Sequence, residues 1–200
     1  MSSAISVVVT AGRGGRALLI TAQSIGSQRA YADVALVTTA GSDNPPLLDS
    51  VATRLGARVV ASNRGPGAGL NQAVRSCAGE LLAIVPAGFV LPSAFLERCV
   101  MAFRTAAEVE ALAPAVEVQT SDGLGRAVWL PAGLDAAAVL ADPASVPPVL
   151  VMRRSTVEAL GGFDEELPAL VEFEFWLRLT LSGRRIAPLL EPLVVRELGV

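Results

Sequence analysis

The chain has 200 residues, a formal net charge of −3, no lysine and no histidine. This length suits one domain with a substantial core, and the scattered arginines lack the basic face that nucleic-acid binding requires. Without histidine, the commonest general base and the imidazole ligands of metal sites are both excluded.

Hydrophobic residues make up 52% of the chain, yet no stretch predicts a membrane span. The longest weakly charged stretch, 81–98, is interrupted by Pro86 and Pro92, whereas a spanning helix needs about 20 apolar residues. No basic segment precedes the first apolar run, so no signal peptide is expected. Cys77 and Cys99 fit no metal or redox spacing. We expect buried free thiols, which indicate a reducing, cytoplasmic location.

The first 113 residues alternate predicted strands and helices joined by short links. Strands are expected at 5–10, 33–39, 58–61 and 80–85, and helices at 16–28, 47–55, 70–77 and 92–105, with a glycine-rich turn at 63–69. This alternation predicts an α/β fold with a doubly wound, mostly parallel sheet and helices on both faces.

The pattern becomes less regular after residue 113. Strands are expected at 116–119, 126–130 and 149–152, helices at 155–160 and 172–181, and a proline-rich loop at 142–148. No repeat or change in composition marks a second domain. We therefore expect a single domain over 1–200.

Three segments together show a family resemblance. They are Thr10-Ala11-Gly12-Arg13, the stretch from Asn63-Arg64-Gly65 to Asn71-Gln72-Ala73, and Gly161-Gly162-Phe163-Asp164-Glu165 followed by a helix containing Leu177-Arg178-Leu179. Their order and spacing resemble the family 2 glycosyltransferases of GT-A fold over nearly the whole chain. The resemblance implies a nucleotide-diphospho-sugar transferase-like fold that binds a nucleotide sugar at the C-terminal ends of its strands. It also implies a nucleotide-binding half, 1–113, and an acceptor-side half, 114–200.

The resemblance places the candidate site on a small set of residues. The candidate substrate-binding residues are Thr10, Ala11, Arg13, Thr39, Asn63, Arg64, Asn71, Ala87 and Trp129. Trp129 is the candidate for stacking on an acceptor sugar. Glu172 would be the catalytic base if the domain is active, and otherwise a favourable charge at a helix N-terminus. The glycine-rich segments equally suit tight turns and close packing.

The sequence departs from the family at the positions that carry its metal-binding and catalytic carboxylates. The acidic pair after the second strand corresponds to Thr39-Ala40, the metal-binding DxD to Pro86-Ala87-Gly88, and the late Glu-Asp pair to Val171-Glu172. Mg²⁺ and Mn²⁺ need oxygen ligands, so no metal site is recognised and no cofactor is expected. Arg13, Arg64 and Arg153 are candidate replacements for the metal.

Three functions remain open. The leading hypothesis is a non-catalytic or severely impaired glycosyltransferase-like domain, a pseudoenzyme that binds a protein partner or a second copy during glycan or glycoconjugate assembly. The second is an active, metal-independent inverting glycosyltransferase with a nucleotide-sugar donor. The third is a nucleotidyltransferase, suggested by the loop from Thr10 to Arg16.

Overall fold

The computed structural model describes residues 4–12, 15–30, 32–39, 44–120 and 125–198. Its strands, in chain order, are β1 (Ile5–Thr10), β2 (Asp33–Thr39), β3 (Arg58–Ser62), β4 (Leu81–Pro86), β5 (Phe89–Val90), β6 (Ala111–Thr120), β7 (Arg126–Trp129), β8 (Leu150–Arg153) and β9 (Ile186–Leu198). Its helices are α1 (Arg16–Gly26), α2 (Pro45–Leu55), α3 (Pro66–Ser76), α4 (Phe95–Thr105), α5 (Ala136–Ala141), α6 (Arg154–Ala159) and α7 (Val171–Leu181), with a 3₁₀ turn, η1, at Pro143–Ser145.

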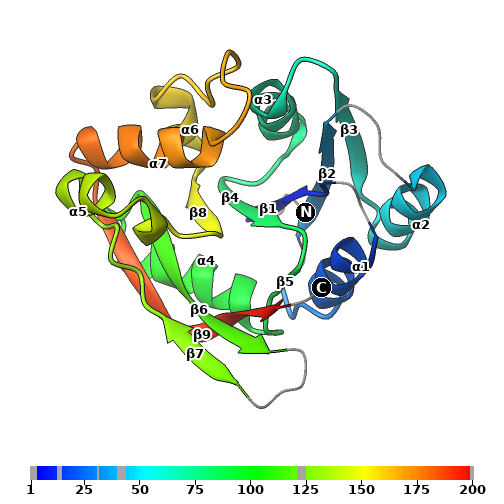
Figure 1. The fold of residues 1–200 in the computed structure, drawn as a ribbon, viewed down its shortest axis with the longest axis horizontal. Helices are drawn as coiled ribbons and strands as arrows, with labels where there is room; N and C mark the ends of the chain where they lie inside the picture. Colours follow the sequence, from blue (N-terminus) through cyan, green and yellow to red (C-terminus); the bar gives the residue numbers. More distant parts are fainter. Residues whose placement is uncertain (1–3, 13–14, 31, 40–43, 121–124, 199–200) are drawn as a thin grey trace.

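The described strands form one curled sheet in the order β3-β2-β1-β4-β8-β6-β9-β5, with β7 paired to β6. The first four strands of this order run parallel, and β8 joins β4 antiparallel. β5 follows β4 directly in the chain, but it lies at the edge of the sheet, where it pairs with β9. The sheet therefore curls round, and the short turn between β4 and β5 links a central strand to an edge strand (Figure 1).

Helices pack on both faces of the sheet, as the sequence predicts. Alternate residues of a strand point to opposite faces, so Val7 and Val9 belong to one buried cluster and Val8 to the other. Leu18, Val51 and Phe95 bring α1, α2 and α4 to the first cluster. The second cluster contains side chains from α3, α6 and α7, namely Leu70, Val157 and Phe175.

Several predicted boundaries are wrong. α3 begins at Pro66 and not at residue 70, because proline lacks only an N–H that a first helical turn leaves unused. The predicted turn at 63–69 is therefore partly helix. α4 begins at Phe95 and not at Pro92, and α1 ends at Gly26 and not at residue 28.

The sequence pattern missed β5, α5 and β9. β9 contains Pro188 and Pro192, and proline weakens a strand prediction because it cannot donate to the ladder. β6 likewise begins at Ala111 and continues through Pro114, where its pairing with β9 shifts register. Both strands are stabilised by partners far away in the sequence, which no local pattern reveals.

Both cysteines are buried and free, as predicted. Burial raises the pKa of the Cys99 and Cys77 thiols, which keeps them protonated. Across the described residues, no helix has both the length and the apolar character that crossing a bilayer demands.

Candidate functional site

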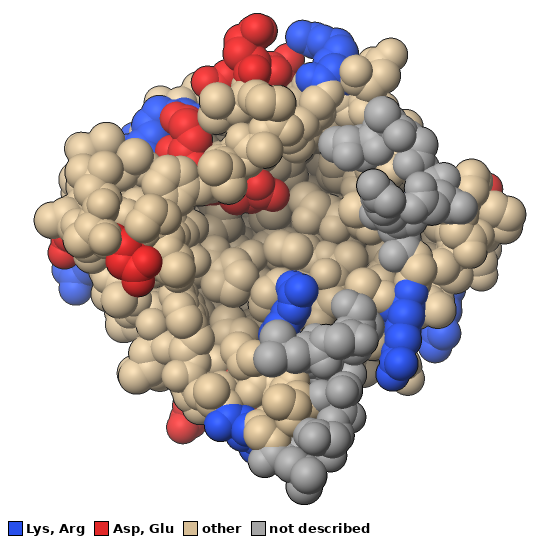
Figure 2. Space-filling view, viewed as in Figure 1, with Lys and Arg blue, Asp and Glu red and all other residues tan. Residues whose placement is uncertain are grey.

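A cavity of about 400 Å³ lies at the C-terminal ends of β1, β2 and β4. Its lining residues are Thr10, Ala11, Gly12, Ala17, Val37, Pro66, Leu70, Pro86, Ala87 and Glu172. Figure 2 shows a hollow at the centre of one face of the molecule, with few charged groups at its edge. Open α/β sheets bind ligands at this end of their parallel strands.

Four of the predicted site residues line this one cavity. Thr10 and Pro86 are opposite each other in the parallel β1–β4 pair, and the amide of Ala87 donates to the carbonyl of Thr10 at 3.0 Å. The amide of Ala11 donates to the Val37 carbonyl of β2 at 2.8 Å. Backbone hydrogen bonds between neighbouring strands thus fix the floor of the cavity, while Glu172 approaches from α7.

Glu172 supplies the one carboxylate among the described lining residues. It lies in the first turn of α7, where the helix dipole favours a negative charge. The helix follows Leu170, which has a left-handed backbone with φ of 60° and is 73% exposed. Farther along the same helix, Glu174 pairs with Arg178 at 2.7 Å, as their spacing predicts.

Asn71 and Arg64 do not line the cavity. Asn71 is buried, and its amide donates to the Phe163 carbonyl and to Glu165, both at 2.9 Å, while its oxygen accepts from the Phe163 amide at 2.8 Å. The Arg64 guanidinium pairs with Glu165 at 2.8 Å. These contacts tie α3 and the turn before it to the Gly-Gly-Phe-Asp-Glu segment that precedes α7. Asn63 is exposed beyond the end of β3.

For two other predicted site residues, the structure describes no side chain. Thr39 ends β2 opposite Ser62 of β3, close to the cavity edge of the sheet, and its side chain is outside the described part of the structure. Arg13 lies outside the described residues altogether.

Trp129 lines a second cavity of about 240 Å³, with Phe89, Val118 and Arg196 among its other walls. Its indole is partly exposed at the end of β7, as a residue available for stacking must be. Trp176, by contrast, is fully buried and donates to the Gly133 carbonyl at 2.7 Å. Trp176 therefore belongs to the core and is not available for stacking on a ligand.

The residues at the position that the sequence resemblance assigns to a metal do not fit a divalent ion. Pro86, Ala87 and Gly88 have no side-chain oxygen, and Glu172 would be the sole carboxylate ligand from the described cavity wall. In the described part of the chain, no group of three His, Cys, Asp or Glu residues could hold a metal. Hard cations such as Mg²⁺ need several oxygen ligands, so the side chains present offer too few.

Thr21, which no sequence pattern singled out, holds the turn at Pro86–Gly88 in place. Its buried hydroxyl accepts from the Gly88 amide at 2.9 Å and donates to the Phe89 carbonyl at 2.8 Å. The Gly88 amide also points to the Ala17 carbonyl at 3.1 Å. Gly88 itself has φ of 99°, a conformation that favours glycine. The turn is therefore held by α1 and has little freedom to move.

Arg196 is the second residue that the sequence pattern missed. It lies opposite Phe89 in the β5–β9 pair, and its guanidinium stacks 4.7 Å from the centre of the Phe89 ring. A Cβ built on Gly88 would be 3.9 Å from both Cζ and Nη1 of Arg196. Arg153, a predicted metal replacement, is instead bound to the carbonyls of Val109, Phe103 and Ala107.

No family model and no curated protein sequence matches the chain. Among solved structures, S. aureus TarS 1-349 matches with a TM-score of 0.75 and 15% identity, over 96% of this chain and 60% of that one. The same protein in complex with UDP-GlcNAc gives 0.75 and 16%, over 96% and 58%. The mannosyltransferase PcManGT from Pyrobaculum calidifontis, in complex with GDP-Man and Mn²⁺, gives 0.73 and 17%, over 98% and 57%.

These similarities show the fold. The chain has a GT-A-like, mixed α/β architecture with a curled, mostly parallel central sheet, the architecture of these glycosyltransferases. It spans about 60% of the length of the neighbours that it matches. The fold class expected from the sequence is therefore confirmed, while activity and substrate have to be argued from the site.

Proposed function

We propose that this chain is a degenerate, family 2-like glycosyltransferase domain that binds a nucleotide or nucleotide sugar without a divalent metal and is non-catalytic or severely impaired. One observation carries the proposal: a cavity lies at the C-terminal ends of β1, β2 and β4, with Glu172 as the one carboxylate in its described wall. The neighbours TarS and PcManGT, in complexes with UDP-GlcNAc and with GDP-Man and Mn²⁺, support a nucleotide-sugar ligand.

The loss of activity follows from the chemistry of the leaving group. A departing nucleoside diphosphate gains negative charge, which a bridging metal stabilises in the family. Losing one preorganised electrostatic group typically costs on the order of 10²–10³ in rate. Here the DxD carboxylates and the first carboxylate of the late pair are replaced by Pro86, Gly88 and Val171, so the expected losses accumulate.

Calorimetry tests this proposal directly. UDP, GDP, dTDP and their sugars would be titrated into the protein with Mn²⁺ and again with EDTA. We expect at least one nucleotide to bind with the same affinity in both conditions. Affinity that requires Mn²⁺ would show that a metal site exists. Absence of binding in both conditions would rule out the ligand class and leave a fold used only for protein contacts.

A metal-independent, inverting glycosyltransferase is the second candidate, and the position of Glu172 favours it. A general base must come within hydrogen-bond reach of the acceptor hydroxyl, and Glu172 projects into the same cavity as Thr10 and Ala87. Hydrolysis or transfer of a bound nucleotide sugar, abolished in Glu172→Gln and retained in Glu174→Gln, would establish this function and refute the impaired one.

No described residue of the cavity favours the nucleotidyltransferase alternative, which would also need carboxylates for Mg²⁺.

A scaffolding role requires a partner, either another protein or a second copy of the chain, and a cytoplasmic setting is part of this proposal. The two free cysteines are consistent with that setting. Leu130, Leu170 and Leu190 are large apolar side chains that are more than half exposed on different elements. Light scattering over a concentration series tests self-association: a constant monomer mass would exclude the second copy.

A further inference from the structure

The guanidinium group of Arg196 lies close to the turn at Pro86–Gly88, the position at which the family resemblance places metal ligands. Arg196 comes from β9, which pairs with β5, and β5 begins at Phe89 directly after that turn. Its guanidinium carbon would lie 3.9 Å from a Cβ on Gly88, and Ala17, which lines the main cavity, would be 3.7 Å from the same Cβ. Arg196 therefore lies beside the turn between the two cavities: Ala87, before the turn, lines the main cavity, and Phe89, after it, lines the second cavity together with Arg196.

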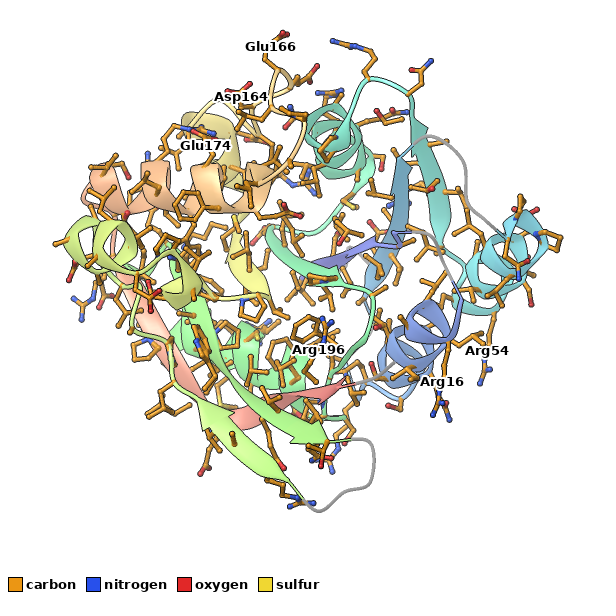
Figure 3. All side chains as sticks on the ribbon, viewed as in Figure 1. Arg16, Arg54, Asp164, Glu166, Glu174 and Arg196 are labelled. Atoms are coloured by element: carbon orange, nitrogen blue, oxygen red, sulfur yellow. The ribbon has the colours of Figure 1, made fainter. Side chains whose placement is uncertain are left out.

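Arg196 has no acidic partner among the described residues. Six other arginines form ion pairs with described carboxylates: Arg58, Arg64, Arg126, Arg178, Arg184 and Arg185. Arg153 and Arg154 donate to backbone carbonyls. Figure 3 shows Arg196 directed toward the middle of the hollowed face, whereas Arg16 and Arg54 extend outward at its margin.

The Phe89 ring orients the Arg196 guanidinium without using its hydrogen-bond donors. Phe89 is 5% exposed, and the guanidinium stacks on its ring at 4.7 Å. A cation above an aromatic ring is attracted by the ring quadrupole. The N–H groups at the edge of the guanidinium plane stay available for two phosphate oxygens, the geometry that arginine offers to phosphates.

We infer that Arg196 binds the diphosphate of the ligand, at the place where the family uses a divalent ion; this inference rests on the proposed function. A fixed guanidinium supplies one positive charge at every physiological pH. That charge suffices to hold a diphosphate through paired hydrogen bonds, but it is half the charge of Mg²⁺ or Mn²⁺. The substitution thus accounts for binding that needs no metal and for weak support of a departing diphosphate.

The test compares two charge-neutralising variants in EDTA. Calorimetry would measure UDP, GDP, dTDP and inorganic pyrophosphate on the native chain, Arg196→Gln and the matched control Arg54→Gln, which removes an exposed arginine of α2. We expect Arg196→Gln to weaken nucleoside diphosphate and pyrophosphate binding at least about tenfold, since two charge-assisted hydrogen bonds are lost. Arg54→Gln should bind like the native chain.

The outcomes distinguish the role of Arg196 from the proposed nucleotide-binding function. Equal nucleotide affinity in the native chain and Arg196→Gln would overturn the role of Arg196 and leave the proposed function standing. Pyrophosphate binding that depends on Arg196, without binding of any nucleotide, would uphold the anion site and refute the nucleotide ligand. Absence of all binding would overturn both.

A second experiment uses the native chain alone, so its result does not depend on whether Arg196→Gln folds. Phenylglyoxal modifies exposed guanidinium groups, and mass spectrometry locates the modified arginines. Pyrophosphate should protect Arg196 from modification and leave Arg54 unprotected. Equal modification of Arg196 with and without saturating pyrophosphate would contradict the inference.

Discussion

The two halves of the chain contribute different chemistry to the main cavity. Every described lining residue from 1–113 is uncharged, including Thr10, Val37 and Ala87. The only charged one, Glu172, comes from 114–200, and Arg196, beside the turn at Gly88, also belongs to that half. The first half thus shapes the cavity with backbone turns, and the second half provides its charge.

Under the proposed function, this difference explains how a binding site outlasts its metal chemistry. Backbone geometry at strand ends is fixed by the sheet ladder and does not depend on the side chains at the turn. A turn without carboxylates can therefore have a fixed shape, as Pro86–Gly88 does under the hydrogen bonds of Thr21. Charge at the site then has to come from elements packed against that turn.

The largest expected effect on stability comes from the close contact between the two halves at Gly67. A Cβ on Gly67 of α3 would lie 2.0 Å from the Asp164 carbonyl oxygen. We expect Gly67→Ala to lower the free energy of unfolding by about 3 kcal/mol, since backbone has to move to relieve the overlap. Urea denaturation followed by tryptophan fluorescence measures it. Gly26→Ala, where the new Cβ would lie 3.7 Å from Leu55, is the control and should not destabilise.

A buried amide makes the second link between the halves. Asn71→Ala removes the partners of the Phe163 amide and carbonyl and a hydrogen bond to Glu165. We expect a loss of about 2 kcal/mol of stability, because buried polar groups are left unsatisfied. Gln72→Ala alters an exposed amide one residue away and should have little effect. Similar denaturation midpoints for the two variants would contradict this account.

The turn at Gly88 can be loosened without changing any cavity side chain. Thr21→Val keeps the shape of the side chain and removes the hydroxyl that binds the Gly88 amide and the Phe89 carbonyl. We expect about 1–2 kcal/mol of destabilisation and weaker pyrophosphate binding by calorimetry. Thr53→Val removes an exposed hydroxyl bonded within α2 and is the matched control. Unchanged stability and binding would show that the turn at Gly88 keeps its shape without the Thr21 hydroxyl.

Asp33, at the N-terminal end of β2 and away from the cavity, makes the stability of the fold depend on pH. Burial raises the pKa of Asp33, but hydrogen bonds from Arg58, the Ala78 amide and Ser6, with the Arg58 charge, outweigh it and hold the pKa below its ordinary 3.8. The ionised carboxylate therefore stabilises the fold above about pH 4, and this contribution is lost as the pH falls through the folded-state pKa.

Asp33→Asn should consequently lower the denaturation midpoint at pH 7, with a gap to the native chain that narrows below pH 4. Ligand affinity should not change, because Asp33 lies at the opposite end of β2 from the cavity. Asp49→Asn, on the exposed side of α2, should have a smaller effect at pH 7. A gap that stays constant between pH 7 and pH 3 would disprove the assignment.

The parallel half of the fold could be predicted from the sequence alone. β1 and β2 occupy the predicted residues because apolar runs and the turns after them are local signals. The family pattern also selected Thr10, Ala11, Ala87 and Glu172, which the structure brings to one cavity. Whether they bind a ligand stays a prediction.

The support of the turn at Gly88, and the charge beside it, could be found only in the folded structure. Arg196 reaches it through the pairing of β5 with β9, and Thr21 through the packing of α1 on β5. Both contacts join segments far apart in the chain, so neither leaves a periodicity or spacing in the sequence. Arg64 and Asn71 show the reverse, since their motif suggested a ligand and their side chains instead hold Glu165. A side chain's partners depend on which segments the fold brings together, and for these residues they were set by long-range packing.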